Sequence, residues 1–158
     1  MAFTLNDFST QVASGLTLQA LNSTGVAAAY HKPGYEITLA DGRKFKYCLF
    51  DSSGVAAVAG APVHWQQTTT PYVVTADLSD SPTGFAGVAT AIYTDGYYVW
   101  VQTGGRVYDA AVSTNVAAGN ALYGVNDGYF DVATDGTNQF FAVALEADTA
   151  GLADIMIL

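Results

Sequence analysis

Hydrophobic and polar residues follow a two-residue period over much of this chain. Runs rich in Val, Ile, Tyr, Phe, Trp and Thr alternate with short turn sequences, which is typical of β-strands joined by tight turns. The turn signals are Asp41-Gly42, Asp95-Gly96, Gly104-Gly105, Asp127-Gly128 and Asp135-Gly136. The pattern predicts successive β-hairpins and an all-β fold.

The register of the first hairpin can be predicted from its side chains. A two-residue loop would place core and charged residues on the same face. A three-residue loop, with Gly42 in the left-handed conformation, separates them because Ile37 then faces Phe45 while Glu36 faces Lys46. We therefore predict the three-residue loop.

A three-stranded meander is predicted next. Its strands are Phe85–Tyr93, Tyr97–Thr103 and Arg106–Val112, with turns at Asp95-Gly96 and Gly104-Gly105. The middle strand is apolar on both faces, so we expect it to be central and buried on both sides.

The last part of the chain predicts two further paired strands. In the run 140–145 the large face is expected to enter a core and the small face to pack closely against another layer. The large face carries Phe141, Val143 and Leu145, and the small face carries Phe140, Ala142 and Ala144. The apolar end, Ile155–Leu158, is also expected to be a paired strand.

These elements predict an antiparallel β-sandwich or a partly closed β-barrel of about eight to ten strands, with an N-terminal arm. Residues 1–29 are interpreted as the arm, with a short helix near Leu5–Ala13, and residues 30–158 as the β-rich domain. The alternative is that residues 1–29 supply the first strand of the main fold.

Composition points to a surface that is covered by a partner. Of the 158 residues, 51% are hydrophobic and only 12% are charged. Few charges and many aromatic rings would leave apolar patches on a monomer, which oligomerisation or docking on a larger assembly would hide. The alternative is a monomer coated with Ser, Thr, Asn and Gln. The net charge of −9 disfavours nucleic-acid binding.

Positive charge is concentrated in the first hairpin, at Arg43, Lys44 and Lys46. These residues are interpreted either as a solvated face that discourages edge aggregation or as a docking surface for an acidic partner. Together with Tyr98 and Trp100 they are the predicted interface residues.

No catalytic motif is present, and we expect neither enzyme activity nor a cofactor or metal site. Cys48 and His64 could imitate a thiol nucleophile and its base, but a buried packing cysteine is the better interpretation. Asp127, Asp131 and Asp135 are interpreted as turn residues rather than calcium ligands, although loose calcium binding stays open.

The aromatic residues have two interpretations. They could build a sugar-stacking platform, or they could fill the core and subunit interfaces, which is the more common use. The candidates for a platform are Trp65, Tyr72, Tyr98, Trp100 and Tyr108. No secretory signal and no membrane span are predicted, so synthesis in a cytoplasm is expected.

Four segments, in this order, resemble the capsid decoration (cement) proteins of tailed bacteriophages. They are Leu39–Val63, Phe85–Val107, Asn115–Gly124 and Val143–Leu158. The resemblance implies a small β-rich protein, often trimeric, on the outer surface of an icosahedral head, where it would clamp neighbouring major capsid protein subunits. It implies no enzyme activity or cofactor. The alternative function is a carbohydrate-binding β module of a phage fibre or surface adhesin.

Overall fold

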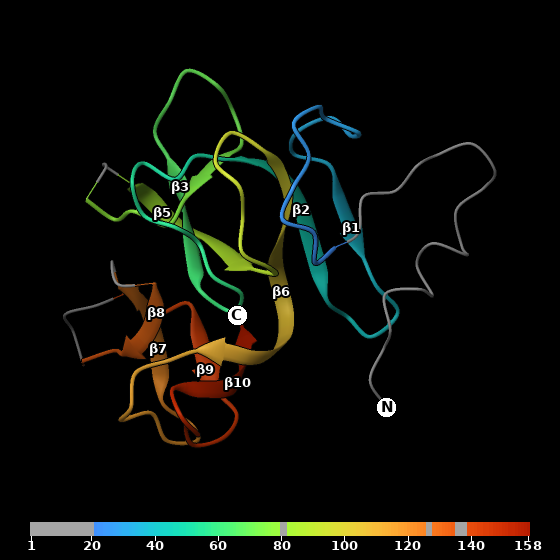
Figure 1. The fold of residues 1–158 in the computed structure, drawn as a ribbon. Helices are drawn as coiled ribbons and strands as arrows, with labels where there is room; N and C mark the ends of the chain where they lie inside the picture. Colours follow the sequence, from blue (N-terminus) through green and yellow to red (C-terminus); the bar gives the residue numbers. More distant parts are fainter. Residues whose placement is uncertain (1–20, 80–81, 126–127, 135–138) are drawn as a thin grey trace.

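The computed structural model describes residues 21–79, 82–125, 128–134 and 139–158, which contain ten β-strands and no helix (Figure 1). The prediction of an all-β fold is therefore confirmed. The strands are β1 (Glu36–Thr38), β2 (Lys44–Phe50), β3 (Pro62–Gln66), β4 (Val73–Thr75), β5 (Pro82–Ala89), β6 (Tyr98–Ala111), β7 (Ala121–Val125), β8 (Tyr129–Val132), β9 (Ala142–Ala144) and β10 (Leu152–Ile157).

Five of these strands close into a barrel. They follow the order β2-β4-β3-β5-β6, and β6 pairs with β2 to complete the ring. The pairing of β2 with β4 is parallel and the others are antiparallel. The barrel alternative of the predicted fold is thus the one adopted, although the sequence did not predict a parallel pair. We call this ring, with the N-terminal half of β6, the first unit.

The first hairpin has the predicted register. Ile37 pairs with Phe45 and Glu36 with Lys46 in the antiparallel ladder of β1 and β2. Gly42 has a φ of 88°, the left-handed conformation that the three-residue loop requires. The side-chain pattern was sufficient here because only one register keeps the apolar and charged faces apart.

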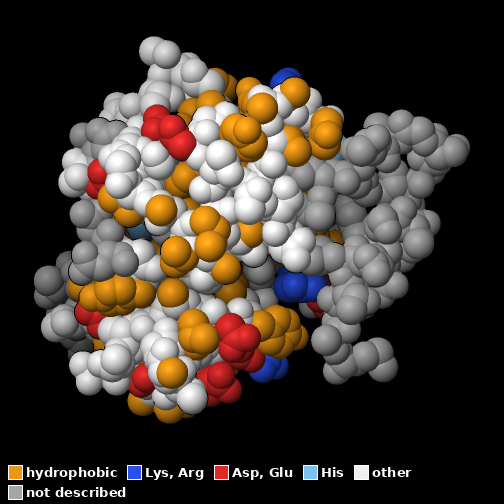
Figure 2. Space-filling model, viewed as in Figure 1, with side chains coloured by type: hydrophobic (Ala, Val, Ile, Leu, Met, Phe, Trp, Pro, Cys, Tyr) orange, Lys and Arg blue, Asp and Glu red, His pale blue; other side chains and the backbone are white. Residues whose placement is uncertain are grey.

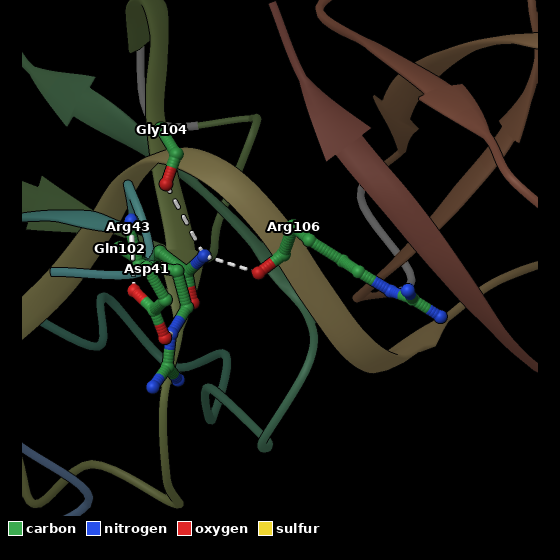
Figure 3. Close-up of polar contacts among 5 residues, drawn as sticks. All are labelled: Asp41, Arg43, Gln102, Gly104 and Arg106. Carbon is green, nitrogen blue, oxygen red and sulfur yellow. Dashed lines mark hydrogen bonds and ion pairs between the residues drawn. The ribbon is translucent and has the colours of Figure 1, made fainter. Parts of the chain in front are cut away.

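The predicted turn at Gly104-Gly105 is wrong. β6 continues through these residues as one bent strand, so the expected second and third strands of the meander are its two halves. A two-residue hairpin turn needs a positive φ at its first central residue, and of this pair only Gly105 has one, at 83°. The Gln102 side-chain amide holds the bend by donating to the backbone oxygens of Gly104 (3.3 Å) and Arg106 (2.8 Å) (Figure 3).

The C-terminal half of β6 begins a second ring with the same order of pairings. It pairs antiparallel with β10, which pairs with β9, which pairs with β7, which pairs with β8. Val112, just after β6, forms a parallel bridge to Phe130 of β8 and completes the ring. This second unit repeats the first with β6, β7, β8, β9 and β10 in the places of β2, β3, β4, β5 and β6. In Figure 1 the long strand β6 joins the two units.

Six backbone hydrogen bonds outside the ladders repeat between the units. Both units use the same turn before their second strand, with a left-handed glycine at Gly60 (φ 81°) and Gly119 (φ 88°). The matched donor–acceptor pairs are Gly60–Ala89 and Gly119–Ala144, Ala61–Val58 and Asn120–Ala117, Ala89–Ala61 and Ala144–Asn120, Tyr93–Ala57 and Asp148–Val116, Tyr97–Thr94 and Leu152–Thr149, and Asp51–Val74 and Ser113–Phe130.

The two faces of β9 are the reverse of the prediction. Ala142 and Ala144 are buried in the core of the second unit, whereas Leu145 is 42% exposed. A five-stranded ring has a narrow interior, so large residues from some strands must be matched by small residues from others. Leu122 and Phe130 supply the large side chains, which leaves room only for the alanines of β9. The expected paired strand at the C-terminus is confirmed as β10.

Part of the predicted arm lies against the first unit. Leu21 is buried with Phe45 and Trp100 on the outside of the barrel wall, and Val26 forms an antiparallel bridge to Tyr98. Residues 1–20, which include the predicted helix, lie outside the described residues.

The repeated glycines give a matched test of how the units pack together. A Cβ on Gly60 would come within 2.7 Å of the Asp109 oxygen of β6, whereas a Cβ on Gly119 would meet nothing within 4 Å. Both alanine variants should lose roughly 1 kcal/mol from left-handed strain, and Gly60→Ala should lose roughly 1–3 kcal/mol more from overpacking. Urea unfolding would measure both, and equal losses would show that this contact contributes nothing to stability.

Candidate functional site

The predicted basic residues of the first hairpin lie in different environments. Arg43 is paired with Asp41 at 2.7 Å, and Lys46 is paired with Glu36 at 2.8 Å. Lys44 is exposed beside Gly104 at the bend of β6. The three residues therefore do not form one continuous cationic surface, because two of the charges have carboxylate partners within the hairpin.

Trp100, one of the predicted interface residues, is a core residue in this structure. Its side chain is 1% exposed, and its ring packs against Tyr47 and His31 at centroid distances of 5.0 and 5.4 Å. Tyr98 is half-buried and stacks on Tyr47. Trp100 thus leaves no ring face for a partner or a sugar.

Two other candidate rings lie beside an open depression of 480 Å³ next to the loop between β3 and β4. We call it the β3–β4 depression. It is lined by Lys46, Trp65, Gln66, Gln67, Thr68, Thr70, Pro71, Tyr72 and Val73. This set combines aromatic rings with amide, hydroxyl and ammonium groups, which is the composition of a site that binds a partly polar small ligand.

The rings of this depression meet edge to face. The centroids of Trp65 and Tyr72 are 6.3 Å apart with an interplanar angle of 70°. The Lys46 ammonium lies 5.4 Å from the Trp65 centroid and 5.9 Å from that of Tyr72, within range of cation–π attraction. Since Lys46 also pairs with Glu36, its charge is held beside the rings.

Tyr72 is held in an unfavourable backbone conformation. Its φ is 61°, in the left-handed region that non-glycine residues rarely adopt. Its ring lies directly on Gly34, where a Cβ would come within 2.5 Å of the ring carbons. The ring remains 42% exposed. The surroundings therefore hold Tyr72 in place at a cost in backbone energy, which is a common feature of binding sites.

A second, smaller cavity of 240 Å³ lies where the two units meet. Its lining includes Leu21, Arg43, Gln102 and Tyr108, so both halves of β6 contribute to it. Figure 3 shows Arg43 beside the Gln102 amide at the bend, while the Arg106 side chain extends away from them. Arg106 instead pairs with Asp154 of β10. Tyr108, the remaining platform candidate, lies beneath the Arg106 guanidinium, 4.8 Å away.

Cys48 and His64 do not form a catalytic pair. Cys48 packs inside the first unit with Val63 and Trp65, the neighbours of His64 along β3, so the His64 side chain projects from the opposite face of that strand. Burial raises the pKa of the Cys48 thiol to about 12. The cysteine is therefore protonated at neutral pH, as expected for a packing residue.

The other titratable candidates show no metal site within the described residues. No three His, Cys, Asp or Glu side chains there are grouped closely enough to hold an ion. Asp131 accepts a hydrogen bond from the Ser113 hydroxyl at 2.7 Å, while Asp127 and Asp135 lie outside the described residues. In the same part of the chain, no helix has the length and apolar character needed to cross a membrane.

Comparison with known proteins yields no assignment, since no family model matches this chain and no curated protein sequence matches it.

Sequence reasoning proposed Trp65 and Tyr72 but missed the residues around them. Gln67, Thr68 and Thr70 are not among the predicted site residues, and Lys46 is predicted only as part of the basic group of the first hairpin. The loop length was the signal that could have found the site. Gln67–Tyr72 separates β3 from β4, which is a longer connection than a tight hairpin needs.

His64 should make the protein less stable at mildly acidic pH. Burial lowers its pKa from 6.5 to about 4. The unfolded state therefore takes up a proton first, so stability is full above pH 6.5 and falls as the pH drops towards 4, by roughly 3 kcal/mol in total. Urea unfolding from pH 7 to 4.5 should show this fall, and His64→Leu should reduce it. An unchanged pH dependence in that variant would exclude His64 as the cause.

Proposed function

We propose that this chain is a structural virion protein that decorates an icosahedral phage head. It would lie on the outer surface of the capsid and bridge major capsid protein subunits, as a homo-oligomer with a trimer favoured. The resemblance of four ordered segments to phage decoration proteins motivates the proposal, and the molecular surface supports it.

The observation that carries the proposal is an apolar surface on β9 and β10, which we call the β9–β10 face. Met156 pairs with Val143 in the ladder, and both point away from the core of the second unit. The exposed fractions of the large side chains on and beside this face are 42% for Leu145, 41% for Leu152, 37% for Met156 and 69% for Leu158. A group of large aliphatic side chains on a sheet surface is characteristic of a protein-binding site.

The charge distribution is consistent with a surface made for protein contacts. Figure 2 shows apolar side chains spread over the viewed surface of both units with few charged groups between them. Only Arg106 is basic after residue 46, so the second unit contains acidic groups and little else that is charged. An acidic exterior repels the phosphate backbone of DNA, which fits a position outside the head rather than inside it.

Two units joined by one continuous strand suit a bridging role. Each unit can contact a different neighbour, and many equivalent sites on an icosahedral shell let modest contacts add up. A second function, carbohydrate binding, is favoured by the β3–β4 depression and is argued in the next subsection.

The proposal predicts that a charge on the β9–β10 face weakens capsid binding. Met156→Glu should lower the affinity for mature heads that lack this protein at least tenfold, about 1.4 kcal/mol, because a carboxylate would have to be desolvated in the contact. Co-sedimentation at increasing protein concentration would measure the affinity. Ala56→Glu, at an exposed position of the first unit, is the matched control of equal charge.

Failure of the unmodified protein to co-sediment with these heads would refute the decoration function. Normal binding by a folded Met156→Glu variant would instead show that another surface makes the contact. Light scattering of the two variants would report in parallel whether the β9–β10 face also holds the oligomer together.

A further inference from the structure

We propose that the β3–β4 depression is a carbohydrate-binding site in which a pyranose ring stacks on Trp65 and Tyr72. This inference goes beyond capsid decoration and does not depend on it. It rests on a comparison of the two units, because the second unit shows what the fold requires when no such site is present.

The loop that forms the depression is longer than the fold needs. In the second unit, β7 and β8 are joined by residues 126–128 only. In the first unit the corresponding connection from β3 to β4 is Gln67–Tyr72. Both rings close with the same pairings, so the additional residues are not required for closure. They form one wall of the depression instead.

Both aromatic residues stand where the second unit has glycine, although Gly124 also has a packing role, since a Cβ there would come within 2.8 Å of the His64 ring. Trp65 lies five residues after Gly60, and Gly124 lies five residues after Gly119. Tyr72 lies two residues before Val74, and Gly128 lies two residues before Phe130; Val74 and Phe130 are the matched backbone acceptors of the two units. Gly128 has a φ of 81° and Tyr72 has a φ of 61°, so the backbone needs the left-handed conformation at this point in both units.

Glycine meets this backbone requirement without strain, whereas tyrosine does not. The ring packs on Gly34, so the fold explains it in part, but the exposure of Tyr72 (42%) is not explained by that contact. It is explained if the ring contacts a ligand, since strain of this kind is retained where a side chain must be held in place.

The remaining lining groups fit a sugar. A pyranose has apolar C–H faces that pack on aromatic rings and hydroxyl groups at its edge that need hydrogen-bond partners. Gln67, Thr68 and Thr70 provide amide and hydroxyl groups at the rim of the depression. The Thr68 hydroxyl donates to the Thr70 oxygen at 2.7 Å, which holds the rim in shape. The net charge of −9 disfavours nucleotides and nucleic acid as occupants.

Lys46 allows the test to distinguish neutral from acidic sugars. Its ammonium is beside both rings but is already paired with Glu36. A neutral pyranose can stack without disturbing that pair, while a uronic acid must compete with the Glu36 carboxylate. Binding of glucuronic acid that is strengthened by Glu36→Gln would identify an acidic sugar, and binding of neutral glycosides alone would identify a neutral one.

The two tryptophans provide a reporter and an internal control for NMR. Methyl glycosides of glucose, galactose and N-acetylglucosamine, and glucuronic acid, would be titrated to about 50 mM, which would saturate a site with a dissociation constant on the order of 1 mM. The Trp65 indole signal should shift and saturate, whereas that of Trp100, which is 1% exposed, should not move. A glycan array probed with the full chain would extend the search to oligosaccharides.

Tyr72→Gly is the decisive variant because it introduces the residue that the second unit has at the corresponding position, Gly128. It should remove the saturable shift or weaken binding at least tenfold, while its unfolding midpoint changes little, because relief of the left-handed strain offsets the lost contact of the ring with Gly34. Tyr72→Phe should retain binding, and Tyr108→Ala, which removes a 58% exposed tyrosine of the second unit, should not affect it.

The proposal is overturned if no sugar shifts Trp65 and no glycan on the array binds, or if Tyr72→Gly binds as the unmodified protein does. Binding of a peptide but no sugar at Trp65 would overturn it as well. Capsid co-sedimentation is measured separately, so either proposal can fail without the other.

Discussion

The fold depends on the continuity of β6 through its bend. This strand is the last strand of the first ring and the first strand of the second, so a break in it would leave both rings open. The bend requires the left-handed Gly105, and the Gln102 amide bonds the backbone on both sides of it. Buried amide groups with satisfied hydrogen bonds favour one geometry over alternatives, so the relative position of the units is fixed locally.

The sequence predicted local pairings well where side chains exclude the alternatives. The first hairpin was correct because a one-residue slip would bury Lys46 and expose Ile37. The glycine pair at the bend of β6 was misjudged because Gly-Gly permits either a turn or a bulge, and only the strands on each side decide between them. The repeat was not predicted, since the units share pairings and glycine positions rather than core residues.

The candidate site could be predicted only in part. Alternation along a strand separates two faces, but it does not say which face another segment covers. Trp100 and Trp65 were therefore equal candidates, although residues 21–26 and β1 cover the first, while the second is half-buried at the edge of the core and lines the β3–β4 depression. The strain at Tyr72 could not be predicted from the sequence. The need for a positive φ at this position becomes evident only when Tyr72 is aligned with Gly128, and that alignment comes from the matched hydrogen bonds of the two units.

Comparison of the two units distinguishes residues that the fold requires from residues that have another role. Positions that match in both, such as Gly60 and Gly119, serve the backbone. Positions that differ against the backbone preference, such as Tyr72 against Gly128, need a contact of the side chain to offset the strain; Tyr72 has one on Gly34 and, in our proposal, a second on a ligand. The same logic applies to surfaces: the first unit covers the outer wall of β2 and β6 with β1 and residues 21–26, while in the second unit Met156 of the corresponding strand β10 stays exposed. A sheet surface that one copy of a unit buries and the other exposes is a candidate for contact with a partner, which is the physical reason for testing Met156 in the proposed function.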